Sequence, residues 1–223
     1  LIMENHFLKK TKGGLIVSCQ ALPDEPLHSS YIMSRMAYAA MLGGAVGIRA
    51  NTAKDIKAIK EAVNIPIIGI IKKDYPGSDV FITPTIEEVD ELIDVGVDVI
   101  AIDATHRPRP DNRSLSDAFA SIRKKYPNQL FMADCAVYSD GIFAKSIGFD
   151  IIGTTLCGYT SETKNISLPN VELLTKFGGT LDMPVIAEGG IWGPDVLASV
   201  MNIPGIHATV IGSAITRPME ITK

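Results

Sequence analysis

Cysteine, basic charge and long apolar runs are all scarce in this sequence of 223 residues. The three cysteines, Cys19, Cys135 and Cys157, are odd in number and widely spaced, which favours reduced, buried thiols in a cytoplasmic protein over a disulfide framework. A formal net charge of −4 argues against a nucleic-acid groove or a polybasic membrane anchor. No apolar run reaches the roughly 18–20 residues of a membrane span, and residues 1–12 lack a signal-peptide pattern. We therefore expect neither a membrane nor nucleic acid as a partner.

Histidine is also sparse, and the four histidines show no paired spacing typical of metal ligands. His106 lies near a predicted strand end, whereas His28 and His207 are expected on the surface or in helices. Cys157 follows a predicted strand, but no histidine partner accompanies it, so a core or loop thiol is favoured over a nucleophile. The sequence therefore predicts no metal site.

Hydrophobic residues make up 46% of the chain, which is enough for a sizeable core, and they form short runs that alternate with helix-like segments. Runs that are apolar on both faces and bounded by turn residues predict eight buried parallel strands: residues 14–20, 45–51, 66–72, 99–105, 130–135, 151–156, 184–190 and 208–215. Helical spacing of apolar side chains predicts helices over residues 29–42, 52–63, 85–95, 114–126, 139–147, 169–177 and 194–201. Thr85 and Glu88 form a capping-box pattern at the start of one of them.

Eight strand–helix repeats in a chain of this length favour a (β/α)8 TIM barrel, the alternative being an open doubly wound sheet. The doubly wound sheet is disfavoured because no G-x-G-x-x-G motif follows the first predicted strand. No linker, low-complexity tract or break in composition divides the sequence, so residues 1–223 are expected to form a single domain. Few residues follow the last predicted strand, and the final helix is expected to be truncated.

Polar side chains end six of the predicted strands, where a barrel carries its chemistry. Side chains alternate between the two faces of a strand, and in each case the polar residue is in phase with one apolar face. The six are therefore expected to converge on one pocket: Gln20, Arg49, Lys72, Asp103, Asp134 and Glu188. Two structural alternatives remain, namely charges that simply meet solvent at strand ends and an ion-pair network at the barrel mouth.

The last two predicted strands end in glycine-rich segments, Gly189-Gly190 and Gly212-Ser213, with Arg217 just beyond. Glycine lets backbone N–H groups approach an anion closely, and barrel enzymes often bind a phosphate at these two loops. Arginine can clamp a phosphate bidentately. A phosphate site is therefore favoured over the alternative that these glycines only form turns.

Several stretches of the sequence resemble the N-acetylmannosamine-6-phosphate 2-epimerase family, in order and over nearly the full length. These stretches are residues 16–21 (Ile-Val-Ser-Cys-Gln-Ala), 47–51 (Gly-Ile-Arg-Ala-Asn), 68–75 (Ile-Gly-Ile-Ile-Lys-Lys-Asp-Tyr), 102–105 (Ile-Asp-Ala-Thr), 152–156 (Ile-Gly-Thr-Thr-Leu), 185–189 (Val-Ile-Ala-Glu-Gly) and 212–218 (Gly-Ser-Ala-Ile-Thr-Arg-Pro). The resemblance implies a cofactor-free barrel of the ribulose-phosphate-binding type, commonly a homodimer. It also implies an isomerase of sialic acid catabolism that converts N-acetylmannosamine 6-phosphate to N-acetylglucosamine 6-phosphate.

Carried over to this sequence, the resemblance makes Lys72 the catalytic lysine and Glu188 the carboxylate that works beside it. It places Gln20, Arg49 and Asp134 in contact with substrate. It assigns phosphate binding to Arg217 and to the backbone of Gly189, Gly190, Gly212 and Ser213. The departures are mild: Lys73 stands where relatives often have arginine, and residues 190–192 vary between members.

Epimerisation at C2 requires the removal and return of a proton on the carbon next to C1, so a base with a pKa near neutral is needed. Burial and the charge of Arg49 could bring Lys72 into that range. Two rival functions remain at this point. One is a Schiff-base aldolase or lyase that uses Lys72 on a phosphosugar, and the other is a barrel that binds a sugar phosphate without catalysis.

Overall fold

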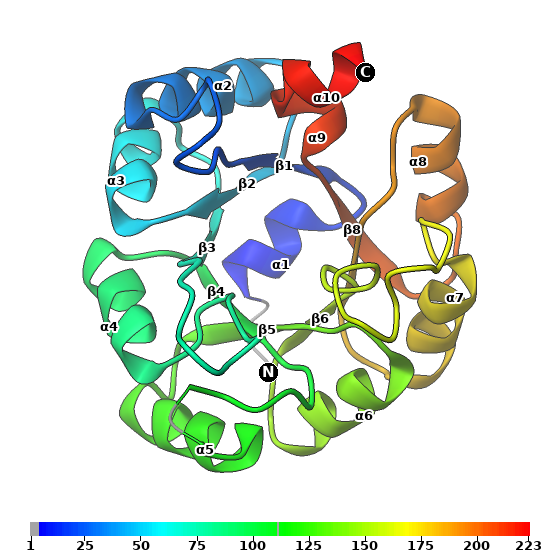
Figure 1. Cartoon of the computed structure of the whole chain (residues 1–223). Coiled ribbons are helices and arrows are strands. Elements are labelled where there is room, and N and C mark those ends of the chain that lie inside the picture. The colour runs from blue at the N-terminus through cyan, green and yellow to red at the C-terminus, as the bar shows by residue number, and fades with distance from the viewer. Residues whose placement is uncertain (1–4, 111) are drawn as a thin grey trace.

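In the part of the chain that the structure describes, residues 5–110 and 112–223 of a computed structural model, eight parallel strands close into a barrel (Figure 1). Each strand pairs with the next along the chain, and Ile16 lies beside Val210 where the last strand meets the first. The strands are β1 (Leu15–Cys19), β2 (Gly47–Asn51), β3 (Ile67–Ile70), β4 (Val99–Asp103), β5 (Leu130–Asp134), β6 (Ile151–Gly153), β7 (Val185–Glu188) and β8 (Ile206–Ile211). The predicted (β/α)8 barrel is confirmed.

A ring of helices surrounds the barrel (Figure 1). It consists of α2 (Ser30–Leu42), α3 (Ala53–Ala62), α4 (Ile86–Val95), α5 (Leu115–Lys125), α6 (Tyr138–Ser146), α7 (Val171–Thr180) and α8 (Pro194–Met201). These bounds agree with the predicted helices to within a few residues, and the capping box of Thr85 and Glu88 is present at the start of α4. None of the helices in the described ranges is long and apolar enough to cross a membrane.

The strand alternation expected from the sequence is confirmed in the core. Ile68, Ala101, Met132 and Ile186 belong to one buried apolar cluster, together with other side chains from the inner face of the barrel. Side chains of the opposite phase pack in separate clusters with the helices. Glu188 follows Ile186 by two residues and thus continues the inward series at the C-terminal end of its strand.

A short helix that the sequence did not predict, α1 (His6–Thr11), closes the N-terminal end of the barrel, and Figure 1 shows it inside the ring of strands. Phe7 is buried in the same cluster as the inward-facing strand residues. Thr11 hydrogen-bonds through its hydroxyl to the ring of His207 at 3.1 Å, and the N–H of Gly13 donates to the carbonyl of His207 at 2.7 Å. The expectation that His207 lies in a helix or on the surface is wrong, because this residue belongs to β8 and is half-buried.

The segment after β8 also differs from the prediction. The strand begins at Ile206 and ends at Ile211, whereas the sequence predicts a strand over residues 208–215. Gly212 instead caps α9 (Ser213–Thr216), which is followed by α10 (Pro218–Thr222). These two short helices occupy the place where the sequence predicts one shortened helix, and α9 brings its first turn to the barrel mouth.

Candidate active site

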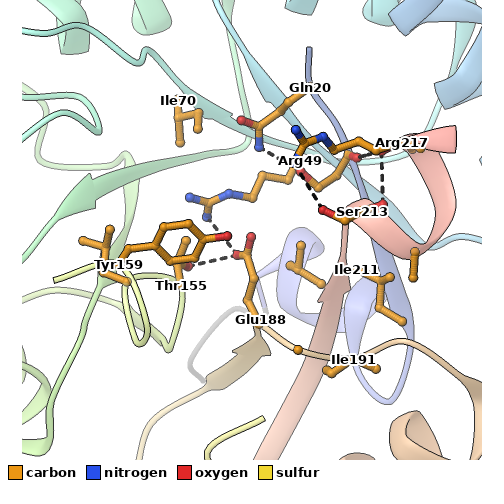
Figure 2. A pocket seen from close by; sticks show the side chains of 18 of the residues that line it. Gln20, Arg49, Ile70, Thr155, Tyr159, Glu188, Ile191, Ile211, Ser213 and Arg217 are labelled. Atoms are coloured by element: carbon orange, nitrogen blue, oxygen red, sulfur yellow. Dashed lines mark hydrogen bonds and ion pairs between the residues drawn. The ribbon is translucent and has the colours of Figure 1, made fainter. Parts of the chain in front are cut away.

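A cavity of about 480 Å³ opens at the C-terminal ends of the strands. Most of the predicted site residues line it: Gln20, Arg49, Lys72, Glu188, Gly189, Gly190, Gly212, Ser213 and Arg217. Figure 2 shows the side chains of Arg49 and Glu188 facing one another there, with Gln20, Ser213 and Arg217 around them. Asp134 and Asp103 do not line this cavity.

The guanidinium of Arg49, at the centre of β2, reaches across the barrel to Asp134 at the end of β5. Two hydrogen bonds of 3.2 and 2.6 Å join the groups, and the two side chains are 1% and 0% exposed. The same guanidinium lies 3.6 Å from Glu188. Burial alone would lower the pKa of Arg49, but the neighbouring carboxyl groups raise it above its ordinary value. Arg49 is thus a fixed positive charge at the floor of the cavity, and Asp134 holds it in place.

Lys72 follows β3, where its backbone is held on two sides. Its N–H donates to the side chain of Asn51 at 2.8 Å, and the residue forms an antiparallel bridge with Ile82. Burial lowers the pKa of its amine, and the positive charge of Arg49 lowers it further, while Glu188 opposes the shift. A lowered pKa increases the neutral fraction of the amine near neutral pH, and the neutral amine is the form that can accept a proton.

Glu188 ends β7, four strands away from Lys72 around the barrel, and its side chain is 17% exposed. Burial raises the pKa of its carboxyl group; Arg49 opposes this effect and the charge of Asp134 adds to it. The cavity therefore holds an amine whose pKa is lowered and a carboxyl group whose pKa is raised. With its pKa lowered, the amine is suited to acting as a base near neutral pH, and with its pKa raised, the carboxyl group is suited to acting as an acid.

The glycine-rich ends of β7 and β8 form a cradle beside these groups. Gly189 and Gly190 have φ angles of 110° and 72°, and a Cβ at residue 190 would lie 2.3 Å from Leu168. Among the described residues, none accepts a hydrogen bond from the N–H groups of Gly189, Gly190 or Ser213. These donors can therefore bind an anion.

Arg217 lies at the edge of this cradle. Its guanidinium contacts the hydroxyl of Ser213 at 3.4 Å and binds both carboxylate oxygens of Glu25 at 3.1 Å each. This fork geometry is the one by which arginine also binds phosphate. Glu25 lies on the loop between β1 and α2 and lines the cavity, although no motif in the sequence points to it.

Asp103 is the strand-end residue that the structure sets apart from the others. Its carboxylate accepts hydrogen bonds from the backbone and hydroxyl of Thr105 and from Arg107 at 2.6 Å. Its carbonyl oxygen accepts a hydrogen bond from Arg109 at 2.9 Å. Asp103 thus organises the loop after β4, which contacts the loop after β3 through a hydrogen bond from Ser78 to Pro108.

A family model described as "NanE: Putative N-acetylmannosamine-6-phosphate epimerase" matches residues 33–223. The chain belongs to this family. The "Putative N-acetylmannosamine-6-phosphate 2-epimerase" of Listeria monocytogenes serovar 1/2a is 57% identical over 222 residues, covering 99% of this chain and 93% of the relative. The protein of the same name from Mycoplasma mycoides subsp. mycoides SC is 51% identical, covering 98% of this chain and 96% of the relative.

A solved structure agrees with this membership of the NanE family, and a more distant one shares the fold. The N-acetylmannosamine-6-phosphate 2-epimerase from Clostridium perfringens superposes with a TM-score of 0.93 at 47% identity, covering 100% of this chain and 96% of that structure. Thiamine phosphate pyrophosphorylase from Pyrococcus furiosus has a TM-score of 0.62 at 18% identity, covering 96% of this chain and 92% of that structure, and shares the fold alone.

One polar residue at the centre of this NanE-family site, Thr155, is not among the residues that the sequence predicts for it. It stands two residues beyond Gly153 and in phase with Ile151, whose side chain packs inside the barrel. Alternation along the strand points to this residue, but its uncharged hydroxyl is a weaker signal in the sequence than the charged and amide groups at the other strand ends. The cysteines play no part in the lining: all three are free and buried, and burial raises the pKa of Cys19 to about 12. In residues 5–110 and 112–223, no group of three His, Cys, Asp or Glu side chains could hold a metal ion.

Proposed function

We propose that this chain interconverts N-acetyl-D-mannosamine 6-phosphate and N-acetyl-D-glucosamine 6-phosphate by removing and returning the proton on C2, as a step of sialic acid catabolism. The observation that carries the proposal is the pair formed by Lys72 and Glu188, which line one cavity with pKa values shifted toward each other. The names of the relatives supply the substrate.

The chemistry takes place on the open-chain aldehyde of the sugar. The C2–H bond is acidic there, because the charge left on its removal spreads onto the C1 oxygen. Lys72 acts as the base that takes this proton, and Glu188 with Arg49 stabilises the charge that develops on oxygen. Arg49 is suited to this role because Asp134 fixes it before substrate arrives, so no reorganisation is needed during reaction.

The phosphate group of the sugar binds in the cradle formed by Gly189, Gly190, Gly212 and Ser213, with Arg217 at its edge. Holding a distant phosphate restricts the motion of the reacting carbon without changing its chemistry. Gln20 also lines the cavity and is assigned to substrate contact. Asp134 serves the substrate through Arg49, and Asp103 through the loop after β4.

Solvent isotope exchange tests the proton-transfer scheme directly. In deuterium oxide, the epimerised product is expected to carry deuterium at C2, because a proton held by an amine exchanges with solvent between removal and return. Mass spectrometry and proton NMR of the product measure it. A product that retains the original hydrogen at C2 contradicts the scheme.

Arg217→Ala tests the phosphate site. Removing one charged partner of the phosphate costs about 1.5–3 kcal/mol, so KM is expected to rise by about 10–100-fold while kcat changes little. Steady-state kinetics measure both constants. Arg35→Ala is the matched control, since Arg35 is exposed on α2 and lies against the ring of Tyr38 outside the cavity. A fall in kcat at unchanged KM would assign Arg217 to the chemistry instead of to binding.

A second candidate function rests on the same lysine. A neutral amine in a cavity can also form a Schiff base with a sugar carbonyl, as in an aldolase or lyase. Borohydride added with substrate distinguishes the two functions, because it reduces a Schiff base to a permanent adduct on Lys72 and leaves the epimerase unmodified.

We propose further that the protein is a cytoplasmic homodimer. Exposed apolar side chains support a dimer: Leu42 on α2, Ile215 on α9, and Met219 and Ile221 on α10 are 42–69% exposed. Ile215 also lines an apolar groove between α2 and α9. Light scattering measures the molar mass that decides this point. The buried, free cysteines are consistent with a reducing compartment.

A further inference from the structure

The hydroxyl of Thr155 lies between two carboxyl groups. Its oxygen is 2.7 Å from Oδ1 of Asp134 and 2.9 Å from Oε2 of Glu188, and Figure 2 shows the contact with Glu188 as a dashed line. Both distances are those of O–H···O hydrogen bonds. A threonine hydroxyl carries one proton, however, and a carboxylate carries none. Two hydrogen bonds therefore need a second proton, which one of the two carboxyl groups must supply.

Arg49 identifies which carboxyl group holds that proton. Both oxygens of Asp134 already accept hydrogen bonds from the guanidinium, which has no acceptor to offer, so Asp134 is the ionised partner. The hydroxyl of Thr155 then donates to Asp134, the shorter of its two contacts. The remaining contact is satisfied when the carboxyl group of Glu188 donates to the oxygen of Thr155.

We propose that Thr155 is a positioning residue that keeps a proton on Glu188 in the resting enzyme, so that Glu188 is the acid of the reaction. The catalytic role of Glu188 in this inference rests on the proposed function. The location of the proton rests on the geometry alone. Burial and the nearby charge of Asp134 also raise the pKa of Glu188, and their effect exceeds the opposing effects of Arg49, of Lys72 and of a hydrogen bond donated by Thr155.

The charges around Glu188 also favour this arrangement. The guanidinium of Arg49 lies 2.6 Å from Asp134 and 3.6 Å from Glu188, so it stabilises the ionised form of Asp134 more strongly than that of Glu188. The amine of Lys72 is the other cation near Glu188, and its pKa is lowered by burial and by Arg49. Further titratable groups that line the cavity are Glu25, Tyr159 and Arg217.

The proton on Glu188 gives the reaction a balanced first step. The amine of Lys72 takes the C2 proton, and the C–H electron pair becomes the C1–C2 double bond. The carbonyl π electrons move to the C1 oxygen, which takes the proton of Glu188. The products are an enol, an ammonium and a carboxylate. On return, the enol proton goes back to Glu188 and the ammonium of Lys72 supplies a proton to C2, on the opposite face when the configuration inverts. The carbonyl, the neutral amine and the protonated carboxyl group are thereby restored.

Infrared spectroscopy of the substrate-free protein tests the assignment through the C=O stretch of a protonated carboxyl group. At neutral pH, the wild type is expected to show such a band that is lost in Glu188→Gln. This subtraction separates Glu188 from Asp103 and Asp140, where burial also raises the pKa. Thr155→Val removes the hydroxyl that accepts the proton, so the pKa of Glu188 is expected to fall. Thr155→Ser keeps the hydroxyl and is expected to keep the band.

The direction in which Thr155→Val changes the pKa of Glu188 decides whether the carboxyl group of Glu188 donates a hydrogen bond to Thr155 or accepts one from it. A hydroxyl that donated to an ionised Glu188 would lower its pKa, so its removal would raise the pKa and overturn the proposal. A wild type without a band from Glu188 at neutral pH would overturn it as well. Thr155→Ser keeps the test valid should the valine variant fail to fold. Because the measurement needs no substrate, a correct band in a protein without epimerase activity would refute the proposed function and leave the proton on Glu188 supported.

Discussion

Replacing Lys72 with alanine is expected to lower kcat by about 10²–10⁴-fold, the contribution typical of a general base. The fold is expected to remain intact, because the backbone of residue 72 is held by Asn51 and Ile82 and not by the amine. Steady-state kinetics on a coupled assay measure the loss, and circular dichroism checks the fold. A variant that keeps wild-type turnover would remove Lys72 from the mechanism.

Lys73→Ala is the matched control, since the same side chain is removed one residue further along. The amine of Lys73 lies 2.9 Å from Glu88 at the start of α4, outside the residues that line the cavity, so turnover is expected to persist.

The pH dependence of the wild type gives a further test of Lys72. The value of kcat/KM is expected to rise with pH through the pKa of Lys72, because only the neutral amine is a base. That rise is expected below the ordinary range of lysine, since burial and Arg49 lower the pKa.

Asp134→Ala is expected to reduce the free energy of unfolding by about 3–5 kcal/mol, the cost of leaving a buried partner unpaired. The guanidinium of Arg49 is 1% exposed and would lose both of its hydrogen bonds to Asp134. Glu188 at 3.6 Å is too distant to replace them. Urea denaturation followed by circular dichroism measures the loss.

A double variant separates the cost of leaving the charge of Arg49 unpaired from the other effects of the Asp134→Ala substitution. Arg49→Met combined with Asp134→Leu removes both charges and fills the space with apolar atoms, and such replacements are often neutral or stabilising. We expect it to recover most of the lost stability while remaining inactive. If Asp134→Ala unfolded at the same urea concentration as the wild type, the pair would not stabilise the fold.

The sequence predicts the barrel well because its signals are local. Ile68, Ile70 and Lys72 lie in one alternating series, and the structure continues that series to the barrel mouth. The same rule does not locate Asp103 correctly relative to the cavity. Whether a strand-end carboxylate faces the cavity or organises a loop depends on its neighbours, and here Arg107 and Thr105 bind it.

Features that rest on distant contacts were not predictable in the same way. Residues 6–11 carry no strand or helix repeat of the barrel, and α1 is recognised only because Phe7 fills the end of the apolar interior. Glu25 enters the site through its pairing with Arg217, which is 192 residues away in the sequence. Periodicity describes one segment at a time and does not report such pairings.

The hydrogen bonds that join Thr11 and Gly13 to His207 connect early and late parts of the chain, since 196 residues separate Thr11 from His207. During translation, the β8 partner of α1 leaves the ribosome long after α1 itself. The contacts between α1 and β8 form only once both segments are available, and contacts of such large sequence separation carry a high loop-closure entropy. We therefore expect the closure of the N-terminal end of the barrel by α1 to be a late event in folding, and the stability of α1 and that of β8 to depend on each other.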